Sequence, residues 1–384
     1  MSPVRDRPVV LATGGTGGHV FPARALARAL AERGWKLAIV TDRRGAGFGD
    51  GAQEIETFRI NAASPGRGAG GKLRGLMQIG AGLLQARTLL RRIEPAAVVG
   101  FGGYASVPTM LAATGAGLPT LIHEQNAVLG RANRLLAPRV RRIATSFPAV
   151  ELVRPRDRAK LVLTGNPVRS EIAAVGALPY PVLEGRKDTL RLLVFGGSQG
   201  AHILSVVVPA AIATLSTPAR ARLAVVQQCR AEDLDAVRAA YDSAGVTAEL
   251  ATFFDDMPRR LTDAHLVIGR AGASTVAEIA AAARPAVLVP YPFATDDHQT
   301  ANAHAAEAAG AAWLMPDAGF TAESLGDRLD ALMADPSQLT EASAAAQRFA
   351  RADAAAGLAD LVESLAAPHS NGNGKSEPHE EKAA

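Results

Sequence analysis

The sequence predicts an α/β protein made of two Rossmann-like domains, each with a parallel sheet, that face each other across a cleft. Short apolar runs alternate with helical patterns, as they do in βα units. A succession of strand, glycine-rich turn and helix opens at residue 9 and starts again at residue 190. The 384 residues are enough for roughly two or three domains, and 48% of them are hydrophobic, which supplies real cores.

The first half opens with a predicted strand at Val9–Thr13 and a glycine-rich turn. An amphipathic helix follows from Pro22 to Arg33, because its apolar residues repeat on one face and Gly34 ends it. Further strands are expected at Leu37–Thr41, Val98–Phe101, Thr120–His123 and Arg142–Thr145.

One stretch, residues 96–122, carries no charge and is long enough to cross a bilayer. Its glycines and prolines divide it, however, into strand, turn, helix and strand. The sequence therefore predicts a buried βαβ segment here instead of a membrane span.

The second half begins after a Pro- and Gly-containing connection at 176–188. Its strands are expected at Leu190–Phe195, Leu223–Gln227, His265–Gly269 and Ala286–Val289, and its last helices at Ala322–Ala334 and Thr340–Ala367. The resulting division is a first domain (1–170), a linker (171–189), a second domain (190–340), a C-terminal helix that packs back on the first domain (341–367) and a disordered tail (368–384).

Charge is distributed unevenly between the two halves. Residues 1–170 hold 25 basic and 10 acidic side chains, whereas the remainder holds 16 basic and 27 acidic ones. This asymmetry favours an anionic partner for the first half, either nucleic acid or an acidic membrane surface. Solvated helix faces are the alternative explanation.

The lone cysteine, Cys229, excludes an internal disulfide framework and a zinc site made of cysteines. It is also consistent with a reducing cytoplasm. The charged start of the chain lacks the apolar core of a signal peptide.

Three predicted strands end in glycine-rich turns, at 14–18, 101–104 and 196–200. Glycines let backbone N–H groups approach an anion, and a following helix adds its dipole. Val20 stands where a dinucleotide fingerprint needs its third glycine, and no P-loop lysine is present. The turns predict a ligand with several phosphates or two phosphorylated ligands.

Asp42 lies at the end of the second predicted strand, where a ribose-binding carboxylate would stand, so a nucleotide-dependent oxidoreductase stays open. The alternative is that Asp42 is a plain turn residue.

Polar side chains at strand and helix ends are candidates for chemistry. His19 either takes a proton from an incoming hydroxyl or caps its helix. The run 123–126 (His-Glu-Gln-Asn) leaves an apolar strand at the end that faces the ligand crevice in open α/β sheets, unless Asn126 is simply a helix cap. Glu278 binds ribose hydroxyls or belongs to a capping box. The pairs 255–256 and 296–297, both Asp-Asp, are interpreted as helix caps.

The segment Lys72 to Arg92 has the helical mixture of apolar and basic residues that suits an interfacial helix on anionic lipid. An ordinary core-facing helix is the alternative, and its glycines also favour a mobile loop. The residues expected at the membrane are Lys72, Leu73, Leu76, Met77, Arg87, Arg91 and Arg92.

Seven motifs together carry a resemblance to a known family. They lie at 14–22, 101–104, 123–126, 164–169, 196–201, 253–257 and 272–278. In order and spacing the chain, from about Val9 to Leu365, resembles the MurG family of N-acetylglucosaminyltransferases of peptidoglycan synthesis.

The resemblance implies a GT-B fold and the inverting transfer of GlcNAc from UDP-GlcNAc to the C4 hydroxyl of MurNAc. The acceptor would be undecaprenyl-pyrophosphoryl-MurNAc-pentapeptide (lipid I) and the product lipid II, for cell-wall biogenesis, cell shape and division. It implies a peripheral enzyme at the cytoplasmic face of the inner membrane, with anionic lipid and other cell-wall synthesis proteins as partners. No cofactor, metal or nucleic acid is expected. A GT-B transferase for another lipid acceptor, or a non-catalytic membrane adaptor, stays open.

The resemblance also implies roles for single residues. His19 is the expected base, with Glu124 as second choice. Donor contacts are expected from Thr16, Gly17, Gly18, Asn126, Arg169, Ser198, Phe254, Ala273, Ser274, Thr275, Val276, Ala277, Glu278 and Gln299. The acceptor pyrophosphate is expected on Gly14, Gly15, Gly102, Gly103 and Tyr104.

Overall fold

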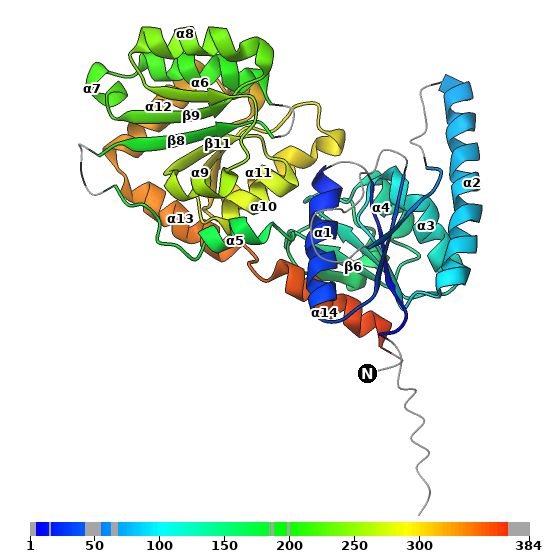
Figure 1. Ribbon diagram of the computed structural model, residues 1–384. Helices are drawn as coiled ribbons and strands as arrows, with labels where there is room; N and C mark the ends of the chain where they lie inside the picture. The colour runs from blue at the N-terminus through cyan, green and yellow to red at the C-terminus, as the bar shows by residue number, and fades with distance from the viewer. Residues whose placement is uncertain are drawn as a thin grey trace, which may run out of the picture.

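The computed structural model describes residues 5–14, 17–42, 55–62, 68–183, 185, 188–197 and 200–367, and these form two lobes (Figure 1). The tail 368–384, expected to be disordered, lies outside the described residues. Each lobe is a parallel sheet between helices, so the predicted fold class of two Rossmann-like domains is confirmed.

The first lobe has seven parallel strands in the order β3-β2-β1-β4-β5-β6-β7. The chain starts at the sheet centre with β1, adds two strands on one side, and then returns to build the other side. The strands are β1 (Val9–Ala12), β2 (Leu37–Thr41), β3 (Glu56–Arg59), β4 (Ala97–Gly100), β5 (Thr120–Glu124), β6 (Arg142–Thr145) and β7 (Leu161–Leu163). Its helices are α1 (Gly17–Glu32), α2 (Gly68–Ile93), α3 (Gly103–Gly115), α4 (Arg131–Leu136) and the 3₁₀ helix η1 (Pro155–Lys160).

The second lobe repeats this topology with six strands in the order β10-β9-β8-β11-β12-β13. The strands are β8 (Leu190–Phe195), β9 (Leu223–Gln228), β10 (Ala248–Ala251), β11 (Leu266–Gly269), β12 (Ala286–Leu288) and β13 (Ala312–Leu314). The helices are α6 (His202–Thr214), α7 (Thr217–Arg220), α8 (Leu234–Ala244), α9 (Met257–Asp263), α10 (Ala273–Ala281), α11 (His298–Ala308) and α12 (Ala322–Ala334), with short 3₁₀ turns η2 (Ala231–Asp233), η3 (Thr295–Asp297) and η4 (Asp317–Gly319).

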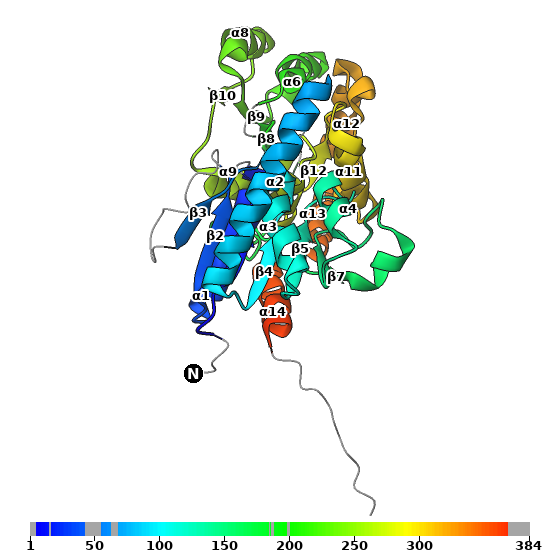
Figure 2. The same cartoon turned by 90° about the vertical axis from the view of Figure 1, so that its right-hand side faces the viewer.

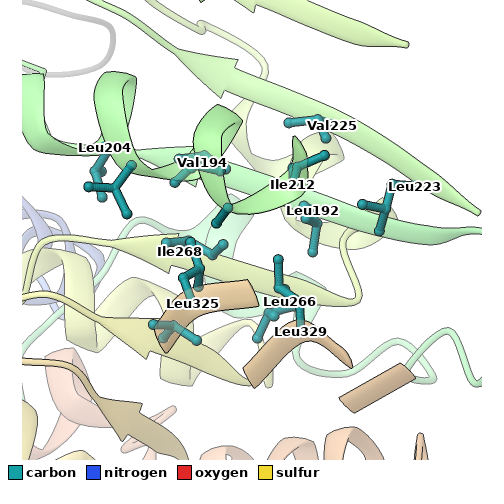
Figure 3. Close-up of a cluster of buried hydrophobic side chains, with 14 of the residues drawn as sticks. Leu192, Val194, Leu204, Ile212, Leu223, Val225, Leu266, Ile268, Leu325 and Leu329 are labelled. Atoms are coloured by element: carbon teal, nitrogen blue, oxygen red, sulfur yellow. The ribbon is translucent and has the colours of Figure 1, made fainter. Parts of the chain in front are cut away.

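The central strands are buried on both faces, which explains their continuous apolar runs. In β8, Leu192 and Val194 pack with Ile212 of α6 and Leu325 of α12 on one side of the sheet (Figure 3). The alternate residue Leu193 belongs to the core on the other side. A strand that buries both sets of side chains lacks polar alternation, so only its length and boundaries identify it as a strand.

Four strands were not predicted, and all four are sheet edges: β3 and β7 in the first lobe, β10 and β13 in the second. Their side chains are mostly partly exposed. An edge strand has one neighbour and less burial, so its sequence needs no apolar run.

The C-terminal helix predicted over 341–367 is in fact two helices. α13 (Ser337–Phe349) packs on the second lobe, and α14 (Ala354–Ala366) packs on α1 of the first lobe. Arg33 and Trp35 donate to Glu363 at 2.8 and 2.7 Å, which anchors α14. The break at 350–353 comes from this crossing between lobes, because the alanine-rich sequence there contains no helix-breaking residue.

The expected linker 171–189 also begins differently. Residues 170–175 form α5 (Ser170–Val175), and its Ile172 and Val175 are buried in the core of the second lobe. The chain therefore passes between the lobes just before α5 and again between α13 and α14.

Candidate active site

His19 lies in the first turns of α1, after the glycine-rich turn that follows β1. Its Nδ1 is 3.2 Å from Oε1 of Gln125, and its ring packs on the turn after β4. A Cβ at Gly102 or Gly103 would come within 3.4 Å of that ring, and both glycines have positive φ (84° and 69°). The second glycine turn therefore leaves room for the imidazole. Gly15 and Thr16 lie outside the described residues.

Burial lowers the pKa of the His19 imidazole from its usual 6.5. The negative charge of Glu124 and the hydrogen bonds that the imidazole donates to Gln125 and to the Phe101 backbone oppose this effect without cancelling it. The imidazole is therefore predominantly neutral near pH 7, the form that can accept a proton.

Glu124, the second-choice base, is 2% exposed, and both of its oxygens are occupied. One oxygen accepts from the backbone and side-chain nitrogens of Asn126, at 3.1 and 3.2 Å. The other accepts from the Gly130 backbone at 2.9 Å and from Asn133 at 2.7 Å. A carboxylate with four donors has little capacity left for a substrate proton, so this geometry suits a structural acceptor better than a base.

Asn126 and its neighbour contact the second lobe through Asn302, a fully buried residue of α11 that sequence reasoning missed. Asn302 accepts from the Ala127 backbone at 2.8 Å and donates to Asn126 at 3.2 Å and to the Ala271 carbonyl at 3.0 Å. One side chain thus joins the turn after β5 to the turn after β11. In the sequence, Asn302 is only a polar residue one helical turn after Gln299. That spacing does not distinguish a buried bridging residue from an exposed position on a helix.

Arg169 joins the first turns of α1 to α10. Its guanidinium forms two hydrogen bonds with the Glu278 carboxylate, at 3.0 and 3.2 Å, and lies 5.8 Å from the ring centroid of Phe21. Phe21 and Glu278, the expected ribose ligand, therefore approach the same guanidinium from opposite lobes, while His19, two residues before Phe21 on α1, faces Gln125 and the turn after β4. The capping-box alternative for Glu278 is not what the structure shows, since its carboxylate pairs with Arg169 and Gly272 caps α10.

Several expected donor residues follow Gly272 in the first turns of α10. Ser274 Oγ is buried and has no hydrogen-bond partner in the described part of the chain. A hydroxyl without a partner at a helix N-terminus is suited to a phosphate oxygen. Thr275, Ala277 and Glu278 are partly exposed on this helix, whereas Ala273 and Val276 are buried.

The remaining donor candidates lie on loops of the second lobe. Gln299 accepts from the Tyr291 backbone at 2.9 Å, and Phe254 is buried with the Arg260 guanidinium 3.9 Å from its ring centroid. The third glycine turn begins at Gly196, where a Cβ would meet Ala201 at 2.5 Å. Ser198 lies outside the described residues, so its expected phosphate contact stays a prediction.

The Asp296-Asp297 pair is more than a helix cap. Asp296 accepts from Arg131 at 3.1 Å and also pairs with Arg134, both from α4 of the other lobe. These two hydrogen-bonded arginines lower the pKa of the Asp296 carboxyl. Asp297 is the N-cap residue of α11, as predicted, but the prediction missed the ion pairs of Asp296, because they join residues more than 160 positions apart.

The segment expected at the membrane is one continuous helix, α2, and not a loop. Figure 2 shows it lying across the first lobe on the face turned toward the viewer, over α3. Ala86, Leu89 and Leu90 are buried against the core, while Met77 and Leu84 are 60% and 66% exposed. Arg87, Arg91 and Arg92 are exposed, and the side chains of Lys72, Leu73 and Leu76 lie outside the described residues.

Across the described ranges, no helix has both the length and the apolar character that crossing a bilayer requires. The uncharged stretch 96–122 forms β4, α3 and β5, in the order that its glycines and prolines predicted.

Comparison with known proteins identifies the fold and the family. Residues 9–145 match the glycosyltransferase family 28 N-terminal domain, and residues 191–358 match the glycosyltransferase family 28 C-terminal domain. In structure, the chain resembles MurG of Acinetobacter baumannii with a TM-score of 0.76 and 32% identity, over 93% of this chain and 99% of that one. A UDP-GlcNAc 2-epimerase from Neisseria meningitidis, at TM-score 0.62 and 12% identity, shares the fold alone.

Two curated relatives match almost their whole length. A protein of Paramagnetospirillum magneticum is 58% identical over 93% of this chain and 96% of its own. One of Rhodospirillum centenum is 55% identical over 98% of both. Both are named UDP-N-acetylglucosamine--N-acetylmuramyl-(pentapeptide) pyrophosphoryl-undecaprenol N-acetylglucosamine transferase. The resemblance seen in the seven motifs is confirmed, and the chain belongs to glycosyltransferase family 28, within its MurG branch.

Proposed function

We propose that this chain transfers GlcNAc from UDP-GlcNAc to the C4 hydroxyl of MurNAc in lipid I, which makes lipid II for peptidoglycan. The names of the relatives, at up to 58% identity over nearly the full length, support this reaction over a GT-B transferase with another lipid acceptor. The oxidoreductase alternative, which depended mainly on Asp42, is not supported, because both halves of the chain match domains of a glycosyltransferase family.

The observation that carries the proposal is the position of Arg169, which links α1 of the first lobe to α10 of the second. His19 and Phe21 stand in the first turns of α1, and Glu278 stands in α10 of the other lobe. An acceptor hydroxyl held by the first lobe and a nucleotide sugar held by the second can therefore meet beside this guanidinium.

In the proposed reaction, His19 removes the proton from the C4 hydroxyl of the acceptor. The oxygen forms a bond to C1 of GlcNAc while the bond from C1 to the UDP oxygen breaks, with inversion at C1. UDP leaves with the electron pair, and we expect Arg169 and the N-terminus of α10 to stabilise its charge. Ser198 is a further predicted contact of the leaving group. Glu278 would exchange its pairing with Arg169 for the ribose hydroxyls, and the first-lobe glycine turns would hold the acceptor pyrophosphate.

A direct test uses radiolabelled UDP-GlcNAc with a short-chain analogue of lipid I. Label should enter the lipid fraction only when the MurNAc-containing acceptor is present. Transfer of label to diacylglycerol at an equal or greater rate would favour the alternative lipid-acceptor transferase. No transfer to any lipid would favour a non-catalytic adaptor.

Replacing Glu278 by alanine should raise the KM for UDP-GlcNAc by about 10–100-fold, because a carboxylate contributes roughly 1.5–3 kcal/mol through its hydrogen bonds. The KM for the acceptor should change little. Steady-state kinetics with each substrate varied in turn measures both values. Glu323→Ala, an exposed carboxylate on α12, is the matched control. A donor KM equal to that of the parent protein would refute the ribose role.

The first lobe is further proposed to dock on the cytoplasmic face of the inner membrane through α2. This helix presents Met77 and Leu84 to solvent beside the exposed Arg87 and Arg91, the combination that binds anionic lipid surfaces.

Reversing the charge of Arg87, Arg91 and Arg92 to glutamate should reduce co-sedimentation with anionic liposomes, since each basic residue near such a surface contributes about 1 kcal/mol. The binding that remains should depend less on salt. The matched control reverses three exposed arginines of the second lobe: Arg238, Arg259 and Arg348. Equal losses in both triple variants would show that total charge matters and α2 does not.

A further inference from the structure

We infer that Gln125 is a positioning residue that holds His19 in the neutral tautomer with its free electron pair on Nε2. The inference rests on the proposed function, because it assigns how the expected base is prepared for its proton transfer. His19, Gln125, His123 and the Gly165 carbonyl form a chain of hydrogen bonds, and the chemistry of each group determines which atom donates and which accepts.

The orientation of the Gln125 amide is fixed by carbonyl groups. Its Nε2 lies 3.1 Å from the Phe101 carbonyl oxygen and 3.3 Å from that of His123. Carbonyl oxygens only accept, so this end of the amide must be the NH₂ group. The other end, Oε1, therefore faces Nδ1 of His19 at 3.2 Å. An amide oxygen cannot donate, so His19 Nδ1 carries the hydrogen, and neutral His19 accepts protons at Nε2.

A second histidine fixes the other side of the amide. His123 is fully buried, and its Nε2 lies 3.0 Å from the Gly165 carbonyl oxygen, so Nε2 is the protonated nitrogen. Its Nδ1 is then free to accept from Gln125 Nε2 at 3.0 Å. Burial lowers the pKa of His123 to about 4, so the ring stays neutral near pH 7 and Nδ1 remains an acceptor. The chain from His19 to the Gly165 carbonyl thus has one consistent direction.

The chain of hydrogen bonds orients the His19 ring through a neutral partner, the Gln125 amide, and places no additional charge beside it. Glu124 is the charged group that acts on the imidazole, His123 is its titratable neighbour, and Arg169 approaches α1 at Phe21. A carboxylate in place of the Gln125 amide would stabilise imidazolium and raise the pKa of His19. The neutral amide opposes the effect of burial on the His19 pKa without reversing it, so the base stays unprotonated near pH 7.

The last acceptor in this chain of hydrogen bonds, the Gly165 carbonyl, lies where the two segments that cross between the lobes pack together. Gly165 has a φ of 85°, and a Cβ there would lie 2.4 Å from Cβ of Arg351, which follows α13. The carbonyl that accepts from His123 therefore belongs to a closely packed backbone segment, which gives the chain a rigid anchor.

Nitrogen-15 NMR of histidine-labelled protein tests the tautomer directly, without reference to activity. His19, assigned by loss of its signals in His19→Gln, should show a protonated Nδ1 and an unprotonated Nε2. In Gln125→Met, which keeps the length of the side chain and removes the amide, this preference should be lost. A protonated Nε2 in the parent protein, or an unchanged tautomer in Gln125→Met, would overturn the inference.

Kinetics with the lipid I analogue provide the second readout. Gln125→Met should lower kcat about 10–100-fold, by analogy with the loss of side chains that orient metal-binding histidines, with little change in the donor KM. Gln125→Glu should move the acidic limb of kcat/KM upward by about 1 pH unit or more. Gln347→Met, an exposed glutamine of α13, is the control and should behave like the parent.

The two assays separate failure of this inference from failure of the proposed function. An expected NMR result without GlcNAc transfer by the parent protein would refute the function and leave the tautomer assignment standing. Transfer by the parent with an unshifted pH profile in Gln125→Glu would refute the role of Gln125 and leave the function standing. UDP binding by each variant verifies that it is folded.

Discussion

His19→Ala should lower kcat for GlcNAc transfer by about 10²–10⁴-fold, the usual contribution of a general base. The imidazole lies against the glycine turn after β4, and burial keeps it in the neutral form that can accept a proton. The KM for UDP-GlcNAc should change little, because the expected donor contacts lie mainly on α10 and the loops of the other lobe. Transfer to the lipid I analogue, followed over time at saturating donor, measures the loss.

His304→Ala is the matched control, since this histidine of α11 is exposed and lies beside Glu307 of the same helix. Glu124 supplies a second comparison. If Glu124 were the base, His19→Ala would retain most of the activity. The four hydrogen bonds to the Glu124 carboxylate instead predict that Glu124→Ala lowers stability along with rate, because buried donors lose their acceptor.

Asn302→Ala should destabilise the protein by about 2–6 kcal/mol, because it leaves the Ala127 N–H and the Ala271 carbonyl without hydrogen-bond partners, and each such buried group costs about 1–3 kcal/mol. The apparent midpoint of thermal unfolding should fall on the order of 5 °C. Differential scanning calorimetry measures the fall and resolves whether the two lobes now unfold separately.

Thr300→Ala on the same helix is the control for this change. Thr300 donates a hydrogen bond to nearby Asp297, at 2.7 Å. Its replacement by alanine should therefore lower the unfolding midpoint much less than Asn302→Ala does. An Asn302→Ala protein as stable as Thr300→Ala would show that the bridge between the lobes contributes nothing to stability.

The site illustrates how far local sequence patterns extend. Glycine turns, a histidine at a helix start and the 123–126 run were visible because each is a short segment with a strong chemical signature. The partners of those residues were not visible. Arg169 and Glu278 are separated by 109 positions, and Asn302 by 176 from Asn126, so no periodicity connects them.

By itself the sequence determined the two-lobed α/β class, every central strand and the family, because buried strands need apolar runs and phosphate turns need glycine. Only the tertiary structure decided the edge strands, the division of the last helix at 350–353, and the contacts that join the lobes. The physical reason is that an edge strand, a crossing and a buried bridge are stabilised by distant parts of the chain. The residues within these elements therefore need no distinctive local pattern from which they could be predicted.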